Sequence, residues 1–354
     1  MDSPLPLVRL GIIGCGAIAE SVHLPAALSS SLVQVNALCD TDNARLNYLA
    51  GRYGLGSIGF TDYRATFSRV DAVVLALPNY LHAPVGVEFL AKGIHVLCEK
   101  PLGNSGTDCR RLCEAAHSSH SVLAVAYVTR FYPSTEMTKR LIDGDFLGPI
   151  SSFDYEFGTE GGWAPLSGYN LTRQTSGGGV LMVSGSHFID RMLYFFSDLE
   201  VVRCFHDGDG GVEADCTVWL QGASNGRVVE GRVTVSKTHM LANRLRIVGE
   251  RGRLEIGEGQ SGSVSYFPID SDLRHELSPN TAEYADAENY FQTQLEDFVR
   301  AIQHGTYPRV TGAQGSKSVA LIERCYEIGE ALSQPWKDST LARLRLALPV
   351  PHPV

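Results

Sequence analysis

Lys100 and its neighbour Glu99 stand where this sequence could move a proton. They fall in the run V-L-C-E-K-P at residues 96–101, in which a carboxylate, an amine and a proline directly follow an apolar strand and so lie at one edge of its sheet. A lysine with the ordinary pKa of about 10.4 is protonated at neutral pH, and lowering that pKa to roughly 7.5 costs on the order of 4 kcal/mol. Burial lowers a lysine pKa in this direction, so Lys100 could act as a base. The alternative is a surface ion pair with Glu99, although adjacent residues of a strand point to opposite faces.

His187 is the second candidate for proton transfer. It lies in the motif G-S-H-F-I-D at residues 185–190, after a triple glycine at 177–179. The spacing of Ile189 and Leu193 predicts a helix around it. The alternative is a histidine satisfied inside the core, but its place in a Gly-x-His-x-x-Asp pattern favours a role in a site.

A glycine turn after the first apolar strand predicts a dinucleotide site. The strand spans residues 8–13, and the following G-C-G-A-I-A is a G-x-G-x-x-A pattern that opens a helix reaching about Ser29. Small residues there permit a tight turn, close approach of the backbone to a pyrophosphate, and close contact between helix and strand. We expect the dinucleotide to contact Gly14, Gly16, Ala17 and Ile18. A plain glycine-rich turn is the alternative.

Asp40 ends the second apolar strand, residues 33–39, at a spacing near that of a ribose-binding acid. Its carboxylate would accept hydrogen bonds from the ribose hydroxyls and repel a 2′-phosphate, which favours NAD over NADP. Residues 41–43 supply no arginine, and Arg45 is expected on the exposed side of the next helix. The alternative is that Asp40 only caps that helix.

Apolar strands alternate with helices through the first 130 residues. Further strands are predicted at 71–76, 94–98 and 122–128, with helices at 81–92 and 106–119. This alternation predicts an α/β fold with a doubly wound, mostly parallel Rossmann sheet over residues 1–130. Ligands bind beyond the carboxyl ends of such strands, where residues 77–82, 99–101 and 129–131 fall.

A second domain, residues 131–354, is predicted from a change of period. Its strands alternate apolar and polar residues, with one face carrying Val212, Ala214, Cys216, Val218 and Leu220. The pattern predicts an α+β domain with a large open, mainly antiparallel sheet that buries one face. Two helical apolar stripes follow, one from Phe291 to Ile302 and one from Leu321 to Leu332.

Composition and charge narrow the class of ligand. A chain of 354 residues with a net charge of −9 favours a small-molecule ligand over nucleic acid or an anionic membrane, either of which would need clustered Lys and Arg. The eight cysteines contain no Cys-x-x-Cys pair, which predicts a reducing compartment, the cytoplasm, and no metal. We expect no signal peptide and no membrane span, because no apolar run approaches roughly 18 residues.

These segments together resemble the Gfo/Idh/MocA family of two-domain nicotinamide sugar oxidoreductases. The glycine turn is followed, in that family's order, by A-L-P-N-Y-L-H, E-K-P and Y-V-T-R-F-Y-P, and then by G-G-G-V-L and G-S-H-F-I-D. The resemblance implies a small sugar-like substrate and a homodimer or homotetramer formed through the second sheet.

The resemblance also implies roles for individual residues. Glu99 would lie near the cofactor ribose, Pro101 would follow a cis peptide that turns Lys100 inward, and His187 would stand beside the reacting hydroxyl. The positive nicotinamide ring would help to lower the pKa of Lys100. Further cofactor contacts are expected from Leu77, Pro78, Asn79, His82, Lys100 and Arg130. Substrate contacts are expected from Lys100, Tyr127, Arg130, Trp163, Tyr169, Arg173 and His187.

The sequence departs from the family at Val183, where many of its dehydrogenases carry an aspartate one helical turn before the histidine. Asp190 could substitute for that acid, although capping or pairing with Arg191 would occupy it. We expect an NAD-dependent oxidoreductase acting on a sugar, cyclitol or sugar derivative. Two alternatives stay open: an NAD-retaining enzyme that cleaves glycosides through transient oxidation, and a non-catalytic nucleotide-binding sensor.

Overall fold

A six-stranded parallel sheet is built by the first part of the chain. The computed structural model describes residues 5–161, 166–258, 264–271, 273–278 and 290–333. The strand order is β3-β2-β1-β4-β5-β6, which reverses direction beside β1 as in a doubly wound fold, so the predicted α/β class is confirmed. The strands are β1 (Val8–Ile13), β2 (Val33–Cys39), β3 (Gly59–Phe60), β4 (Ala72–Leu75), β5 (His95–Cys98) and β6 (Leu123–Val125).

Helices cover both faces of this sheet because its strands are apolar on both sides. The helices of this part are α1 (Leu24–Ser29), α2 (Asn43–Tyr53), α3 (Asn79–Leu90) and α4 (Gly106–Ser119). Helix α1 continues a π-helical turn, Ala19–His23. Side-chain caps from Asp42 and Ser105 fix the starts of α2 and α4. Short 3-10 turns lie at Tyr63–Thr66 and Val128–Phe131.

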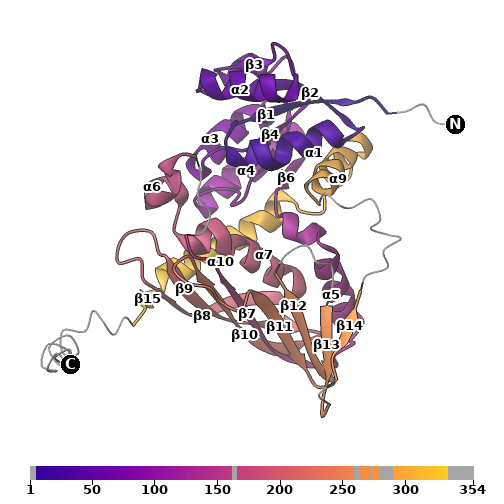
Figure 1. Ribbon diagram of the computed structural model, residues 1–354, viewed down its shortest axis with the longest axis vertical. Helices are drawn as coiled ribbons and strands as arrows, with labels where there is room; N and C mark the ends of the chain where they lie inside the picture. The colour runs from indigo at the N-terminus through magenta and orange to yellow at the C-terminus, as the bar shows by residue number, and fades with distance from the viewer. Residues whose placement is uncertain (1–4, 162–165, 259–263, 272, 279–289, 334–354) are drawn as a thin grey trace, which may run out of the picture.

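The second sheet has nine strands and lies below the first in Figure 1. Its order is β14-β13-β12-β11-β7-β10-β9-β8-β15, and only β7 with β10 and β8 with β15 pair in parallel among the described strands, so the predicted mainly antiparallel sheet is confirmed. The strands are β7 (Ile150–Gly158), β8 (Ser197–His206), β9 (Asp215–Ser224), β10 (Arg227–Ser236), β11 (Arg244–Gly249), β12 (Gly252–Gly257), β13 (Val264–Pro268), β14 (His275–Leu277) and β15 (Glu330–Ala331).

One face of the second sheet is buried and the other is open. Along β9, Cys216, Val218 and Leu220 are buried while Trp219 is 37% exposed, as the period of two predicts. The buried face packs under the helices α5 (Pro133–Asp143) and α7 (Ser186–Phe195), the latter continuing a π-helical turn, Leu181–Gly185. The short helical segments Gly168–Leu171 and α6 (Arg173–Ser176) lie between β7 and the π-helical turn.

The last two helices return toward the first sheet. Helix α9 (Tyr290–His304) lies beside α1 in Figure 1, and its Leu295 and Phe298 are buried in the same apolar cluster as the β1 strand. Helix α10 (Gly312–Glu327) contributes Val319 to the first sheet's core and Ile322 to the second's. The predicted division of the chain into two domains at residue 130 does not include this contribution of later helices to the first sheet.

Helix α10 is shorter than its apolar stripe predicted. It ends at Glu327, and the chain then enters β15, so Leu332 lies outside the helix. The backbone N–H of Leu332 instead donates to the carbonyl of His206, which extends the edge of the second sheet. All eight cysteines are free thiols. Within the described ranges, every helix is too short or too polar to cross a bilayer.

Candidate active site

A cavity of about 270 Å³ lies between the strand ends of the first sheet and the segment that leads into α7. The carboxyl ends of the first sheet's strands contribute Leu77, Glu99, Lys100 and Ala126 to its wall. Facing them, the second half of the chain contributes Phe157, Tyr169, Val183, Ser184, His187 and Phe188. Ile18, Asn79, Val128 and Phe291 complete the lining. This is the place at which a doubly wound sheet binds its ligand.

Lys100 reaches across the cavity to the second half of the chain. Its Nζ donates a hydrogen bond to the backbone carbonyl of Val183 at 2.7 Å, and the peptide bond to Pro101 is cis, as the resemblance implied. Burial lowers the pKa of Lys100 below its ordinary value, while the charge of Glu99 opposes that shift. A buried amine with a lowered pKa can accept a proton from a substrate hydroxyl.

Glu99 is held by a residue that the sequence did not single out. His23 Nε2 lies 2.6 Å from Glu99 Oε1, and both side chains are buried. Burial alone would raise the pKa of Glu99, but the interactions of its carboxylate with His23 and Lys100 together hold that pKa below its ordinary value. His23 lies one turn after Ala19, the third small residue of the glycine motif, so helical periodicity could have placed it toward the strand ends.

His187 faces the cavity from the first turn of α7. Its Nδ1 is buried and has no hydrogen-bond partner among the described residues, and its ring packs edge-on against Tyr127 at 5.8 Å between centroids. Burial lowers the pKa of His187 far below its ordinary value, and the charges of Lys100 and Arg191 lower it further. The imidazole is therefore neutral at physiological pH.

The triple glycine before α7 lets three parts of the chain meet closely. A Cβ on Gly179 would lie 2.0 Å from the carbonyl oxygen of Glu213, and one on Gly178 would lie 2.0 Å from the Tyr326 hydroxyl. The Glu213 carboxylate accepts hydrogen bonds from the N–H groups of Gly179 and Leu181. This contact fixes the turn that carries Val183 and His187.

The glycine turn at residues 14–16 fits a dinucleotide. Gly14 has a φ of +95°, and a Cβ there would lie 2.3 Å from the carbonyl oxygen of Ala76. A Cβ on Gly16, in contrast, would meet no atom within 4 Å, so the turn faces open space where a phosphate can approach. Ala17 and Ile18 stand at the start of the helical segment that follows. Their N–H groups have no acceptor within the helix, so they can donate to a phosphate.

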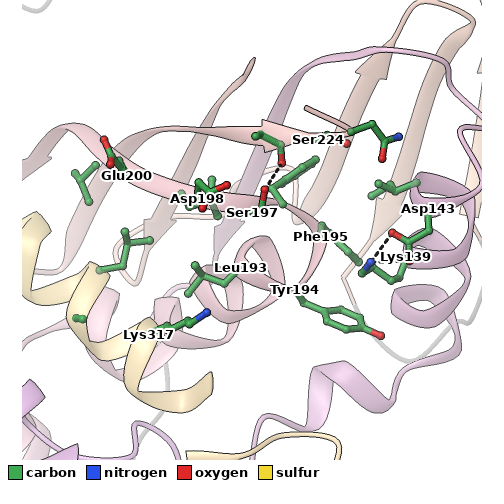
Figure 2. A pocket seen from close by; sticks show the side chains of 18 of the residues that line it. Lys139, Asp143, Leu193, Tyr194, Phe195, Ser197, Asp198, Glu200, Ser224 and Lys317 are labelled. Carbon is green, nitrogen blue, oxygen red and sulfur yellow. Dashed lines mark hydrogen bonds and ion pairs between the residues drawn. The ribbon is translucent and has the colours of Figure 1, made fainter. Parts of the chain in front are cut away.

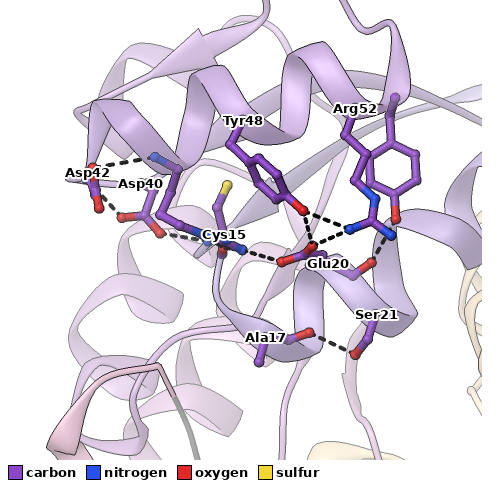
Figure 3. Close-up of polar contacts among 10 residues, drawn as sticks. Cys15, Ala17, Glu20, Ser21, Asp40, Asp42, Tyr48 and Arg52 are labelled. Atoms are coloured by element: carbon purple, nitrogen blue, oxygen red, sulfur yellow. Dashed lines mark hydrogen bonds and ion pairs between the residues drawn. The ribbon is translucent and has the colours of Figure 1, made fainter.

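Asp40 lies beside this turn at the end of β2. Its Oδ2 accepts a hydrogen bond from the Cys15 N–H at 2.7 Å, and its Oδ1 accepts one from the Asp42 N–H at 2.9 Å (Figure 3). Asp42, and not Asp40, caps α2. Each carboxylate oxygen of Asp40 keeps a lone pair that can accept from a ribose hydroxyl.

Arg45 corrects an expectation drawn from the sequence. Its side chain does not point to solvent from α2 but folds over the glycine turn, where Nε and Nη2 donate to the Cys15 carbonyl at 3.0 and 2.8 Å. The reason is a carboxylate on the neighbouring helix, because Glu20 Oε2 accepts from Arg45 Nη2 at 2.7 Å.

His82 lies behind the cavity wall, so its expected contact with the cofactor needs correction. It is fully buried, and both ring nitrogens face backbone carbonyls, Pro101 O at 2.8 Å and Leu77 O at 2.9 Å. His82 thereby ties together two loops at the strand ends. Pro78 precedes α3, and Asn79 in the cavity wall donates to the Ser176 carbonyl at 2.8 Å.

Arg130 also lies away from the cavity, because a buried acid holds it. Its guanidinium makes two hydrogen bonds of 2.7 Å to Asp190, and both side chains are buried. Asp190 therefore neither substitutes for the missing acid beside His187 nor pairs with Arg191, which instead pairs with Glu258 at 2.6 Å. Tyr127 is buried behind the His187 ring rather than lining the cavity.

Three expected substrate contacts fall in different places. Tyr169 lines the cavity, Trp163 lies outside the described residues, and Arg173 is exposed with its guanidinium 4.4 Å from the Tyr326 ring centre. A larger hollow of about 970 Å³ lies elsewhere, beside Tyr194, Asp198 and Lys317, and contains none of the predicted site residues (Figure 2).

Comparison with known proteins decides the family. The profile of GFO_IDH_MocA, an oxidoreductase family with an NAD-binding Rossmann fold, matches residues 8–127. The profile of its C-terminal alpha/beta domain matches residues 139–330. The chain belongs to the Gfo/Idh/MocA oxidoreductase family. The resemblance inferred from the motifs is therefore confirmed, as is the use of a nicotinamide dinucleotide.

Relatives of this Gfo/Idh/MocA protein match almost end to end. The rhizopine catabolism protein MocA of Rhizobium meliloti is 28% identical over 92% of this chain and 95% of its own. A dTDP-3,4-didehydro-2,6-dideoxy-alpha-D-glucose 3-reductase of Actinomadura kijaniata is 26% identical over 89% and 94%. The WlbA dehydrogenase of Bordetella pertussis, solved with NADH and UDP-GlcNAcA, superposes with a TM-score of 0.78 at 20% identity over 91% and 95%.

Proposed function

We propose that this chain transfers a hydride between NAD and a hydroxyl or keto carbon of a sugar, cyclitol or sugar derivative, with Lys100 moving the hydroxyl proton. The observation that carries the proposal is the position of Lys100, which lies in the cavity wall together with His187 and has its Nζ hydrogen-bonded to the Val183 carbonyl. The curated name of the Actinomadura relative supports a sugar nucleotide or deoxysugar as the class of substrate.

Each residue of the site has a separate task in this proposal. Neutral Lys100 accepts the hydroxyl proton during oxidation and returns it during reduction, and the Val183 carbonyl holds its amine in place. Neutral His187 orients the reacting hydroxyl by a hydrogen bond. Gly14, Gly16, Ala17, Ile18 and Asp40 would hold the dinucleotide, which supplies the hydride acceptor when bound.

A coupled absorbance screen tests the proposal. The full chain is incubated with NAD and a panel of sugars, sugar phosphates and nucleotide sugars, and NADH is followed at its absorbance band. We expect NADH to accumulate with one class of the panel and a Lys100→Met variant to lose that signal. Release of an aglycone without net NADH would replace the proposal with glycoside cleavage, and turnover by the variant would remove Lys100 as the base.

The second sheet supports a further part of the proposal, a homodimer or homotetramer. Trp219 of β9 and Val228 of β10 are exposed large apolar side chains on its open face, and Arg232 of β10 pairs with Asp154 of β7. We propose that this face meets a second copy in the cytoplasm, where eight free thiols stay reduced. Native mass spectrometry of the wild type and a Trp219→Glu variant tests it, and a monomeric wild type would contradict it.

A further inference from the structure

Glu20 binds two arginines beside the glycine turn. It lies on the π-helical turn Ala19–His23, and its carboxylate faces α2. Oε2 accepts from Arg45 Nη2 at 2.7 Å, and Oε1 accepts from Arg52 Nη1 at 2.6 Å and from the Tyr48 hydroxyl at 3.0 Å (Figure 3). The hydrogen bond from Arg45 holds the pKa of Glu20 below its ordinary value, so the group is ionised.

This network adjoins the residue expected to face the ribose. Cys15 connects the two, since its N–H donates to Asp40 and its carbonyl accepts from Arg45. The Arg45 guanidinium and the Asp40 carboxylate therefore flank a single residue of the glycine turn. A phosphate carried on the hydroxyl that Asp40 binds would lie within the field of Arg45.

Guanidinium groups are the usual partners of a 2′-phosphate, because they donate two parallel hydrogen bonds to it. Arg45 already directs Nε and Nη2 to the Cys15 carbonyl and to Glu20, and the Glu20 carboxylate offsets its positive charge. We propose that Glu20 is a selectivity residue of the dinucleotide site: it holds Arg45 and Arg52 in ion pairs, so that a 2′-phosphate meets the charge of Asp40 uncompensated and the site selects NAD over NADP. This inference rests on the dinucleotide site of the proposed function.

Equilibrium binding tests the inference without any substrate. The dissociation constants of NADH and NADPH are measured by nicotinamide fluorescence for the full-length wild type, Asp40→Asn, Glu20→Gln and the double variant. Asparagine keeps an oxygen for the Cys15 N–H, and glutamine keeps the shape of Glu20. Glu88→Gln is the matched control, because Glu88 also accepts from an arginine and a tyrosine, Arg64 and Tyr63, but on α3.

The expected result is a gain that appears only when both acids are changed. We expect wild type and Glu88→Gln to prefer NADH by about tenfold or more, and the double variant to bind NADPH about tenfold more tightly than Asp40→Asn does, the size of one charge-assisted hydrogen bond. The gained NADPH affinity should fall as salt is raised, because it is a charge interaction near the surface.

Three outcomes would overturn the inference, and they differ from one another. If the double variant binds NADPH no better than Asp40→Asn, Arg45 and Arg52 do not reach the phosphate. If Glu20→Gln weakens both dinucleotides equally and lowers the melting temperature, Glu20 only joins the π-helical turn to α2. If the wild type binds neither dinucleotide, the proposed function itself fails.

Discussion

The Nζ of Lys100 lies 2.7 Å from the backbone carbonyl of Val183, the residue that replaces the expected aspartate. The lysine is thus oriented by an uncharged group of the main chain. A carboxylate at this position would stabilise the ammonium form, whereas a carbonyl orients the amine and leaves its pKa to burial and to Glu99. That carbonyl belongs to the π-helical turn Leu181–Gly185, and π-helical turns are frequent at functional sites.

Replacing Lys100 by methionine should separate catalysis from folding. We expect kcat to fall by about 10²-fold or more, the usual contribution of a general base. The melting temperature should be maintained or rise, because a buried amine with a lowered pKa destabilises the native state. Steady-state kinetics and thermal unfolding check both, and a variant with full turnover would contradict the role of Lys100.

The rate of oxidation should rise with pH through a single group. Because burial lowers the pKa of Lys100 from 10.5, its neutral form becomes available below the pH at which a free lysine titrates. His187 is already neutral, so we expect it to cause no further change in the rate of oxidation above pH 6.5. A kcat profile from pH 6 to 10 measures this, and reduction should show the opposite slope. A rate independent of pH over that range would argue against a titrating base.

Restoring the acid should move this profile. Val183→Asp places a carboxylate beside Lys100 and His187, which raises the pKa of both. The rising limb of the oxidation profile should therefore shift to higher pH. Val183→Asn, which has nearly the same shape without the charge, is the control and should leave the limb in place. Equal shifts in the two variants would show that shape and not charge is responsible.

Asp190 should matter for stability. Asp190→Asn leaves the buried Arg130 guanidinium without its charge partner, which costs about 3–5 kcal/mol. The exposed pair of Arg9 with Asp71 has a similar two-point geometry, and Asp71→Asn should cost about 1 kcal/mol or less. Urea unfolding compares the two variants. Equal losses would mean that burial does not govern these pairs.

The first sheet could be predicted because its signals are local. The strands at residues 8–13 and 33–39 have the predicted bounds, since each is an apolar run that ends at a turn residue. The second sheet was predicted from its period of two, but its order was not. Pairing of β7 with β10 joins segments far apart in the chain, and no local pattern encodes such a register.

The positions of Lys100 and His187 in the cavity wall, and of Gly14 in the turn after β1, could be predicted because each lies in a short local motif. Expectations failed where a side chain had a partner from elsewhere in the chain. Arg130 pairs with Asp190 and Arg45 with Glu20, and neither partner lies within its own motif. The roles of the cavity residues stay predictions until the kinetic variants are measured.

Helix α9 makes the dinucleotide module discontinuous along the chain. Its Leu295, Phe298 and Val299 cover strands of the first sheet, although strands β7 to β14 of the second sheet lie between them and that sheet in sequence. A chimeric gene that joins two family members at a single point near residue 130 would therefore combine the first-sheet strands of one protein with helix α9 of the other. Shuffling of cofactor modules among these enzymes, in nature or in the laboratory, has to transfer two separate stretches of gene together.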